Sequence, residues 1–365
     1  MKIGLGLYAD SLNERNFKFA KQAGATHIVA HLVNYFGGQD PQISRGDDDG
    51  WGTTSHHQSW DEASLRALIH QLRQHGLELA AIENFDPAQW HDILLDGPQK
   101  YAQVEVIKAS IRAAGRAGVP TIGYNFSIAG VWGWTRGPYA RGGAMSVGFD
   151  ATSELLNAPI PDGMVWNMRF RQQEGSKTLA QVSPQELWSR LEWFLHQVLP
   201  TAEECGVNLA LHPDDPPVEQ LRGTARLVNQ PEKYEKLLNI SRSKANQIEL
   251  CLGSVQEMPA SQMDVYQTLE KYVREDRVGY IHFRNVKGKV PRYQEVFVDE
   301  GDIDMPRIVA LLHHLNYQGV IIPDHTPAME CDASWHAGMA YALGYMRALV
   351  QLAEQGRLPL PEVSA

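Results

Sequence analysis

Short apolar runs recur along the chain, and each is followed by a helix-like stretch. Several are introduced by a Gly or a polar turn, as in AGAT, HGLE and NYQG. Brief apolar runs of this kind are typical of strands buried on both faces, as in parallel sheets. The runs cover residues 2–7, 27–32, 78–83, 121–126, 208–212, 248–252, 279–283 and 319–323. The pattern therefore predicts eight buried β-strands.

Longer stretches between these runs are amphipathic, with apolar residues at three- and four-residue spacing. The clearest are 63–76, 99–118, 184–206 and 305–316. Several end in Gly, which is a common helix stop signal. We therefore predict helices over these ranges, each lying between two strands.

Eight strands that alternate with helices predict one closed (β/α)8 barrel, the TIM-barrel architecture of the α/β class. An open doubly wound sheet is the alternative, but no G-x-G-x-x-G motif follows the first run. The chain has 365 residues, and barrels commonly exceed the yardstick of about 150 residues per domain. Because no linker divides the sequence, we predict a single domain over 1–365.

Two segments are too long to be simple connections, namely about 33–60 after the second strand and about 127–183 after the fourth. Long loops in compact domains are usually functional or disordered. These two are rich in Trp, Tyr, Arg and Gly, unlike the polar composition of disordered segments. We expect ordered lid or subunit-contact segments, and we expect the protein to be a homo-oligomer.

Composition narrows the choice of partners and compartment. A formal net charge of −10 disfavours nucleic acid and anionic membranes, which both require clustered positive charge. The N-terminal stretch turns polar after a few residues, unlike a signal peptide, and no apolar run reaches the length of about 18 residues that a membrane span needs. The three cysteines are too few and scattered for a disulfide framework. We expect a cytoplasmic protein that acts on a small molecule.

Four potential metal ligands lie at the carboxyl ends of the last four predicted strands: His212, Cys251, His282 and Asp324. In a barrel, side chains at these ends converge on one mouth although they are far apart in sequence. A thiolate, two imidazoles and a carboxylate can bind a divalent transition metal and leave positions for water or substrate. Alone, each residue has a plainer interpretation as a hydrogen-bonded His, a core Cys or a helix cap. Their joint order favours a metal site.

Several neighbours of these four residues carry useful chemistry. His325 suits general acid–base catalysis because the ordinary pKa of histidine lies near neutrality, although a surface loop His is the alternative. Arg284 offers a bidentate fork for a carboxylate, whereas Lys287 is better interpreted as a solvated loop charge. Asp214 and Asp215 could orient ligands or cap a helix.

Taken together, these motifs resemble the mannonate dehydratase family of xylose-isomerase-like barrels. The resemblance spans most of the chain. It is carried by HPDDPP (212–217), Cys-x-Gly-Ser (251–254), His-x-Arg (282–284) and Pro-Asp-His (323–325). Weaker support comes from YNF (124–126), WTR (134–136) and PDG (161–163). It implies a hydro-lyase of hexuronate degradation that converts D-mannonate to 2-keto-3-deoxy-D-gluconate and water. It also implies Mn²⁺, with Fe²⁺, Co²⁺ or Zn²⁺ as alternatives.

Carried over by position, the resemblance makes the four candidate ligands the metal site and His325 a catalytic acid–base. Predicted substrate contacts are Arg284, Asn125, Trp134, Arg136, Asp214 and Glu83. The family places a catalytic Tyr, in a Gly-Tyr setting, a short way downstream of Asp-His. This chain has no Gly-Tyr at that spacing, so we assign the role to Tyr341, with Trp335 or His336 as alternatives at that location. The segment 137–167 also departs from the family pattern.

Three other functions compete with dehydration. A sugar or sugar-acid isomerase or epimerase needs two acid–base groups on opposite faces of the sugar, and Glu83 is a candidate for the second. A barrel nuclease of the endonuclease IV type is disfavoured by the acidic charge and by the Cys ligand. A non-catalytic protein that binds sugar acids is the alternative from a different class.

Overall fold

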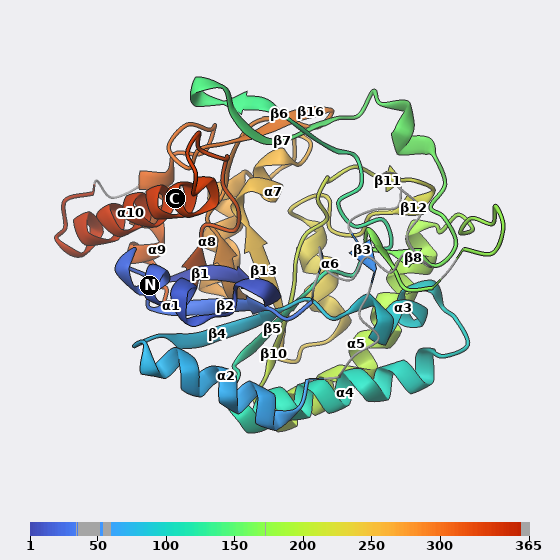
Figure 1. Cartoon of the computed structure of the whole chain (residues 1–365). Coiled ribbons are helices and arrows are strands. Elements are labelled where there is room, and N and C mark those ends of the chain that lie inside the picture. Colours follow the sequence, from blue (N-terminus) through green and yellow to red (C-terminus); the bar gives the residue numbers. More distant parts are fainter. Residues whose placement is uncertain (34, 36–51, 54–59, 172, 359–365) are drawn as a thin grey trace.

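A computed structural model describes residues 1–33, 35, 52–53, 60–171 and 173–358. Eight parallel strands close into a barrel in the order β1-β17-β14-β13-β10-β5-β4-β2 (Figure 1). They are β1 Lys2–Tyr8, β2 His27–His31, β4 Glu78–Glu83, β5 Thr121–Tyr124, β10 Asn208–Leu211, β13 Asn246–Cys251, β14 Val278–His282 and β17 Val320–Ile322. All eight correspond to the predicted apolar runs, so the predicted (β/α)8 barrel is confirmed.

The described helices surround the barrel (Figure 1). They are α1 Glu14–Gln22, α2 Glu62–Gln74, α3 Pro87–Leu95, α4 Lys100–Ala117, α5 Pro184–Cys205, α6 Lys233–Ile240, α7 Leu252–Glu257, α8 Val265–Arg274, α9 Met305–His314 and α10 Ser334–Glu354. Local sequence sets several boundaries. Ser183 and Glu186 form a capping box at the start of α5, and Gly206 ends it in the left-handed conformation at φ 65°. None of the described helices is long and apolar enough to cross a membrane.

An aromatic cluster fills the space between the barrel and α3 and α5. The Trp90 ring lies 5.7 Å from Phe194 and 5.8 Å from Phe126, and Phe85 lies 5.5 Å from Trp90. These side chains are at most 3% exposed. They come from the ends of β4 and β5 and from the helices outside them, so their packing fixes the mouth of the barrel on this side.

A second sheet stands outside the barrel and is built from two hairpins far apart in sequence. Its strands are β6 Trp134–Ala140, β7 Ala144–Asp150, β15 Asn285–Lys289 and β16 Arg292–Val296, in the order β15-β16-β7-β6. The central pairing aligns Phe149 with Tyr293. This outer sheet therefore joins the segment after β5 to the segment after β14.

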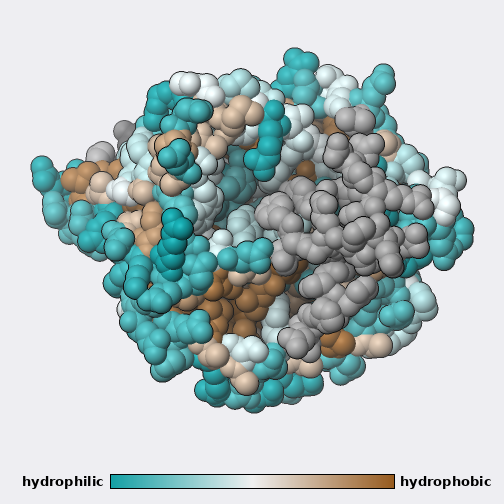
Figure 2. Space-filling model, in the orientation of Figure 1, coloured by the Kyte–Doolittle hydropathy of each residue, from teal (hydrophilic) through white to brown (hydrophobic). Residues whose placement is uncertain are grey.

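The predicted long loop at 127–183 is thus ordered and carries the β6–β7 hairpin, together with the short strands β8 Met164–Val165 and β9 Met168–Arg169. Sequence periodicity missed the hairpin because Gly137, Pro138 and Gly148, which are residue types depleted in strands, interrupt its two strands. Most of the other predicted loop, 33–60, lies outside the described residues; within it, β3 Gly52–Thr53 pairs with β9. Short strands β11 Gln220–Leu221 and β12 Thr224–Ala225 form a small hairpin after β10. Hydrophilic side chains dominate the described surface in Figure 2.

Candidate metal centre and substrate pocket

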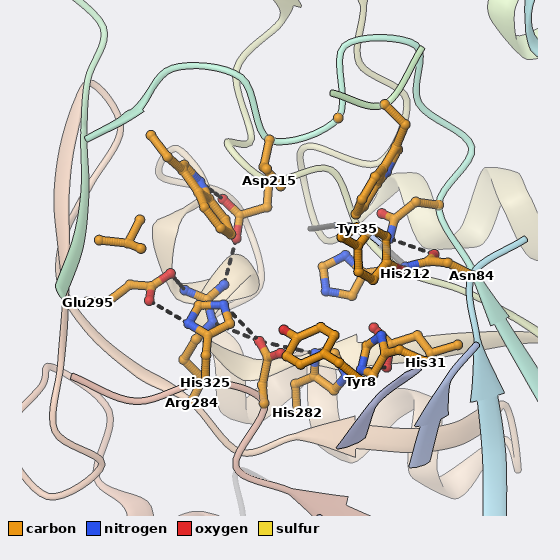
Figure 3. Close-up of a pocket in the computed structure, with 18 of the residues that line it drawn as sticks. Tyr8, His31, Tyr35, Asn84, His212, Asp215, His282, Arg284, Glu295 and His325 are labelled. Carbon is orange, nitrogen blue, oxygen red and sulfur yellow. Dashed lines mark hydrogen bonds and ion pairs between the residues drawn. The ribbon is translucent and has the colours of Figure 1, made fainter. Parts of the chain in front are cut away.

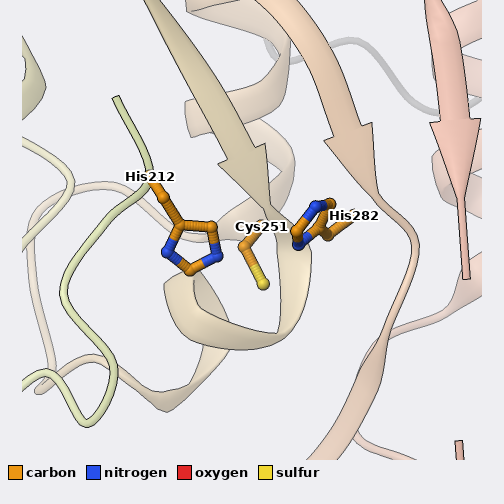
Figure 4. A group of neighbouring side chains, drawn as sticks. All are labelled: His212, Cys251 and His282. Carbon is orange, nitrogen blue, oxygen red and sulfur yellow. The ribbon is translucent and has the colours of Figure 1, made fainter. Parts of the chain in front are cut away.

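Three of the four predicted ligands meet at the carboxyl ends of the barrel strands. Cys251 and His282 are aligned register partners at the ends of β13 and β14, and His212 directly follows β10. Candidate ligand atoms of His212, Cys251 and His282 all lie within 4.8 Å of one another. Figure 4 shows the three side chains turned toward a common point.

Asp324 lies next to this group, two residues beyond β17. Its Oδ2 is 3.4 Å from Nδ1 of His282. The backbone of Asp324 adopts φ 56°, a left-handed conformation that is uncommon for residues other than glycine and concentrates at functional sites. The structure therefore places all four predicted ligands close together, and Asp324 contacts the other three through His282.

The chemistry of these donors fits a bound cation. Burial alone would raise the pKa of Cys251, but Arg284 and the two histidines lower that pKa well below its ordinary value and so favour the thiolate. Burial alone would lower the pKa of His212, but Glu249 and Cys251 raise it to about 9. The pKa of His282 is likewise raised, against the effect of burial, by Asp324 and Glu249. The site thus carries an excess of negative charge that stabilises positive charge, as a metal centre requires.

Two carboxylates, those of Glu249 and Glu83, lie against the His282 ring and offer oxygen atoms as further candidate metal ligands. Oε1 of Glu249 lies 2.9 Å from Nε2 of His282, and Oε2 of Glu83 lies 3.3 Å from the same nitrogen. Burial and the proximity of Glu83 raise the pKa of Glu249, whereas His31 and His282 outweigh burial and lower the pKa of Glu83 to about 2. Glu83, Glu249 and His282 also have candidate ligand atoms within 4.8 Å of one another, so they form a second possible ligand set.

Arg284 sits inside a ring of acidic groups and is only 3% exposed. Its Nη2 contacts Asp215 at 2.6 Å, and its Nη1 contacts Glu257 at 2.7 Å and Glu295 at 2.8 Å. Nη2 also lies 3.4 Å from Sγ of Cys251. The guanidinium therefore supplies the positive charge that these three carboxylates face, and it also contacts the candidate thiolate ligand. Its donors face protein groups, so the placement does not support the predicted contact with a substrate carboxylate.

The two adjacent aspartates have different surroundings. Asp215 faces the mouth of the barrel, where it accepts hydrogen bonds from Tyr293 Oη at 2.7 Å and Trp134 Nε1 at 3.2 Å. Asp214 instead pairs with buried Arg226 at 3.2 Å and accepts the backbone N–H groups of Leu227 and Val228. Asp214 is not among the described residues that line the pocket, so its placement indicates a structural role rather than the predicted substrate contact.

The pocket is lined by the candidate ligands His212 and His282 together with His325 (Figure 3). The predicted site residues in its lining are Glu83, Asn125, Trp134, Arg136, His212, His282, Arg284, Asp324 and His325. Arg136 is exposed on β6 and makes no hydrogen bond or ion pair with any described residue. Asn125 donates to Asn84 at 3.2 Å, and Asn84 donates to Tyr35 Oη at 2.7 Å. Among the described residues, the wall thus combines the guanidinium of Arg136 with amide and aromatic groups.

His325 projects into this pocket between two carboxylates. Its Nδ1 lies 2.8 Å from Oε2 of Glu295, and its Nε2 lies 3.3 Å from Oδ2 of Asp324. The ring packs edge-on against Trp134 with centroids 5.6 Å apart. Burial would lower the pKa of His325, but Asp324 and Glu295 raise it to about 9. An imidazole held in this way is placed to exchange a proton with a ligand in the pocket.

Tyr341 does not join the described lining of the pocket. It lies on α10, where its hydroxyl contacts Arg141 at 3.3 Å and its ring packs on Phe297. Its two alternatives also lie elsewhere: Trp335 packs on His336, which hydrogen-bonds to Asn16 at 3.0 Å. The structure therefore does not bring any of these three residues into the site. The described tyrosines that line the pocket are Tyr8 and Tyr35.

Comparison with known proteins decides the family. A sequence profile described as D-mannonate dehydratase (UxuA) matches residues 8–355. The chain belongs to the D-mannonate dehydratase family. The mannonate dehydratase of Streptococcus suis is 34% identical over 281 residues, which cover 73% of this chain and 75% of that protein. The corresponding protein of Streptococcus pneumoniae is 33% identical with the same coverage. The resemblance drawn from the sequence motifs is confirmed.

Solved structures extend this likeness to the fold. A crystal structure of mannonate dehydratase from Streptococcus suis serotype 2 matches with a TM-score of 0.75 at 28% identity, covering 100% of this chain and 97% of that one. A structure of L-ribulose 3-epimerase matches with a TM-score of 0.55 at 15% identity, covering 97% and 96%. At that identity the second likeness shows the shared barrel alone.

Within this member of the D-mannonate dehydratase family, sequence reasoning missed three acidic residues of the site. Glu249 was visible as a charged residue inside the apolar run IELCL, where an unpaired charge would be costly. Glu257 and Glu295 gave no comparable signal, because they lie on a short helix and on the unpredicted outer sheet. Their part in the site depends on where β16 and α7 pack against Arg284.

Proposed function

We propose that this protein dehydrates D-mannonate to 2-keto-3-deoxy-D-gluconate and water with the help of a divalent metal ion. The observation that carries the proposal is the convergence of His212, Cys251 and His282 on a pocket that also holds His325, in a member of this family. Imidazole and thiolate donors suit first-row transition metals better than Mg²⁺ or Ca²⁺. We propose Mn²⁺ as the native ion, with Fe²⁺, Co²⁺ or Zn²⁺ as alternatives.

In this proposal His212, Cys251, His282 and Asp324 hold the ion. When bound, the ion supplies positive charge that stabilises the negative charge developing on the substrate as its C2 proton leaves. Arg284 keeps the thiolate of Cys251 in place through its contact at 3.4 Å. Glu83 and Glu249 contact His282, so they orient this imidazole by direct hydrogen bonding.

Dehydration breaks the C2–H bond and the C3–O bond and forms an enol, which becomes the 2-keto acid when C3 takes up a proton and the enol hydroxyl loses one. One protein group must accept the C2 proton, and a proton must reach the departing C3 hydroxyl so that it leaves as water. We assign one of these transfers to His325, the imidazole that projects into the pocket. Its contacts with Glu295 and Trp134 limit the ring orientations.

Arg136 is our candidate for binding the substrate carboxylate. Its guanidinium lines the pocket without a partner among the described residues, and a planar guanidinium matches a carboxylate in a bidentate pair. Trp134 and Asn125 line the same pocket and are candidates for contacts to the sugar hydroxyls. This assignment replaces Arg284, whose donors are used within the protein.

The direct test incubates purified protein with Mn²⁺ and a panel of aldonic acids, and measures formation of a 2-keto-3-deoxy acid. We expect product from D-mannonate, and absence of product with metal-loaded protein would overturn the proposal. Running the reaction in deuterated water separates the competing function. An epimerase would incorporate deuterium into the sugar acid without loss of water.

We further propose a cytoplasmic homo-oligomer. Cys205, Cys251 and Cys331 are all free, which suits a reducing compartment. Light scattering coupled to size-exclusion chromatography would measure the mass of the assembly, and a mass of one chain would contradict this part of the proposal.

A further inference from the structure

Glu295 links two groups of the site that lie on different elements. One carboxylate oxygen, Oε2, lies 2.8 Å from Nδ1 of His325, and the other, Oε1, lies 2.8 Å from Nη1 of Arg284. We propose that Glu295 is a positioning residue, which fixes the orientation of the His325 ring through Nδ1 and so directs Nε2 toward Asp324 and the pocket. The inference rests on the acid–base role proposed for His325.

The carboxylate is itself held firmly in place. Glu295 is 3% exposed and lies on β16, where it is aligned with Val286 of β15. Its backbone carbonyl accepts a hydrogen bond from Ser146 of β7 at 2.7 Å. Both edges of this strand are therefore paired, and Arg284 restrains the side chain. Because both its backbone and its carboxylate are held in place, Glu295 can fix the orientation of the neighbouring His325 ring.

His325, by contrast, comes from a segment without regular secondary structure and is partly exposed to the pocket. The groups that face its ring come from four elements: Glu295 on β16, Trp134 on β6, Arg284 after β14 and adjacent Asp324. Of the two carboxylates that contact the His325 ring, that of Glu295 is closer, at 2.8 Å compared with 3.3 Å for Asp324. An imidazole that donates Nδ1–H to a carboxylate has a defined ring orientation, and here that orientation turns Nε2 toward Oδ2 of Asp324 at the pocket.

Glu257 provides a matched control for this role. It contacts the same Nη1 atom of Arg284, at 2.7 Å, and is fully buried. It is not in the described lining of the pocket and makes no described contact with His325. Burial raises the pKa of Glu257 well above its ordinary value. Substituting Glu257 therefore disturbs the Arg284 cluster without removing the Glu295–His325 contact.

The first test compares Glu295→Gln with Glu257→Gln in protein loaded with Mn²⁺. We expect Glu295→Gln to lower kcat by about 10- to 100-fold, the usual scale for loss of an orienting partner, with KM and metal content little changed. Glu257→Gln should lower kcat less than Glu295→Gln does, because Glu257 contacts Arg284 but makes no described contact with His325. Equal kcat values for the two variants would overturn the proposal, as would a loss confined to KM.

A second variant, Glu295→Asp, keeps the proposal testable if Glu295→Gln fails to fold. It keeps the negative charge beside Arg284 but withdraws the carboxylate from His325 by one methylene, about 1.5 Å. We expect a kcat between those of the wild type and Glu295→Gln. A kcat equal to that of the wild type would contradict the need for the contact with Nδ1.

A measurement without turnover separates this inference from the proposed function. In metal-free protein with ¹⁵N-labelled histidine, a hydrogen-bonded Nδ1–H of His325 should give a downfield, slowly exchanging proton signal that His325→Asn removes. We expect the signal to persist in Glu257→Gln and to be lost in Glu295→Gln; persistence in Glu295→Gln would overturn the positioning role. If the wild type shows this signal yet dehydrates no aldonate, the proposed function fails while the positioning contact stands.

Discussion

Cys251 and His282 are aligned partners in the parallel pairing of β13 and β14, and each occupies the last residue of its strand. Adjacent parallel strands lie about 4.8 Å apart, so aligned side chains at their ends are within reach of one ion. Because both residues belong to the hydrogen-bonded barrel, their separation does not depend on a loop. Two ligands of the proposed metal centre are therefore set by the register of the sheet.

Replacing Cys251 should reduce metal binding. Loss of an outer-shell partner alone costs about 10- to 100-fold in metal affinity, so we expect Cys251→Ser to weaken Mn²⁺ binding by at least about 100-fold. Isothermal titration calorimetry would measure this change. The exposed Cys331 is the control, and Cys331→Ser should bind Mn²⁺ like the wild type. Equal affinity in the two variants would exclude Cys251 as a ligand.

Removing the metal should lower both activity and thermal stability. An ion that binds the native state stabilises it by about 2.7 kcal/mol when its concentration is 100 times the dissociation constant. We expect chelation followed by dialysis to abolish turnover and lower Tm, and added Mn²⁺ to restore both. Differential scanning calorimetry of Cys251→Ser with and without Mn²⁺ tests whether the change in Tm comes from an ion bound at this site. A Tm that still rises with Mn²⁺ to the wild-type extent would place the ion elsewhere.

His325→Asn should nearly abolish turnover and keep the metal. Loss of a general acid–base group lowers kcat by about 10²- to 10⁴-fold. Steady-state kinetics and metal analysis of the same sample would measure both properties. His336→Asn is the matched control, because that histidine hydrogen-bonds to Asn16 outside the pocket. Loss of turnover in His336→Asn together with full activity in His325→Asn would reverse the assignment.

The fold and the convergence of the candidate metal ligands were predictable from the sequence because they depend on local patterns. Each barrel strand is a short apolar run, and strand ends converge in any closed barrel, which is why His212, Cys251 and His282 lie together as expected. The surroundings of Arg284 were not predictable in this way. Whether a guanidinium faces substrate or protein depends on Glu257 and Glu295, which reach it through packing between distant elements.

The same limit explains the misplacement of Tyr341. The sequence showed only that a tyrosine follows Asp324 at some distance, and a helix can turn any of its residues toward or away from the barrel. The rotation of α10 directs the hydroxyl of Tyr341 to Arg141, outside the pocket. No sequence pattern fixes such a rotation when the helix has apolar residues on several sides.

Arg136 should govern substrate affinity. Hydrogen bonds to charged groups contribute about 1.5–3 kcal/mol, which corresponds to a rise in KM of about 10- to 100-fold for Arg136→Ala, with a smaller change in kcat. Steady-state kinetics with D-mannonate would measure the two constants. Arg292→Ala is the control, since Arg292 lies on the same outer sheet but pairs with Asp150 at the surface. An unchanged KM in Arg136→Ala would assign carboxylate binding to another group.

Asp214 should act on stability rather than on substrate binding. It neutralises Arg226, a guanidinium that is 2% exposed, so Asp214→Ala leaves a buried charge without its carboxylate partner. Breaking such a pair costs about 3–5 kcal/mol of unfolding free energy, which denaturant titration would detect. Asp162→Ala, which breaks a partly exposed pair with Arg171, should cost no more than about 1 kcal/mol. If Asp214→Ala instead kept the wild-type unfolding free energy and raised KM, the original assignment to substrate binding would be restored.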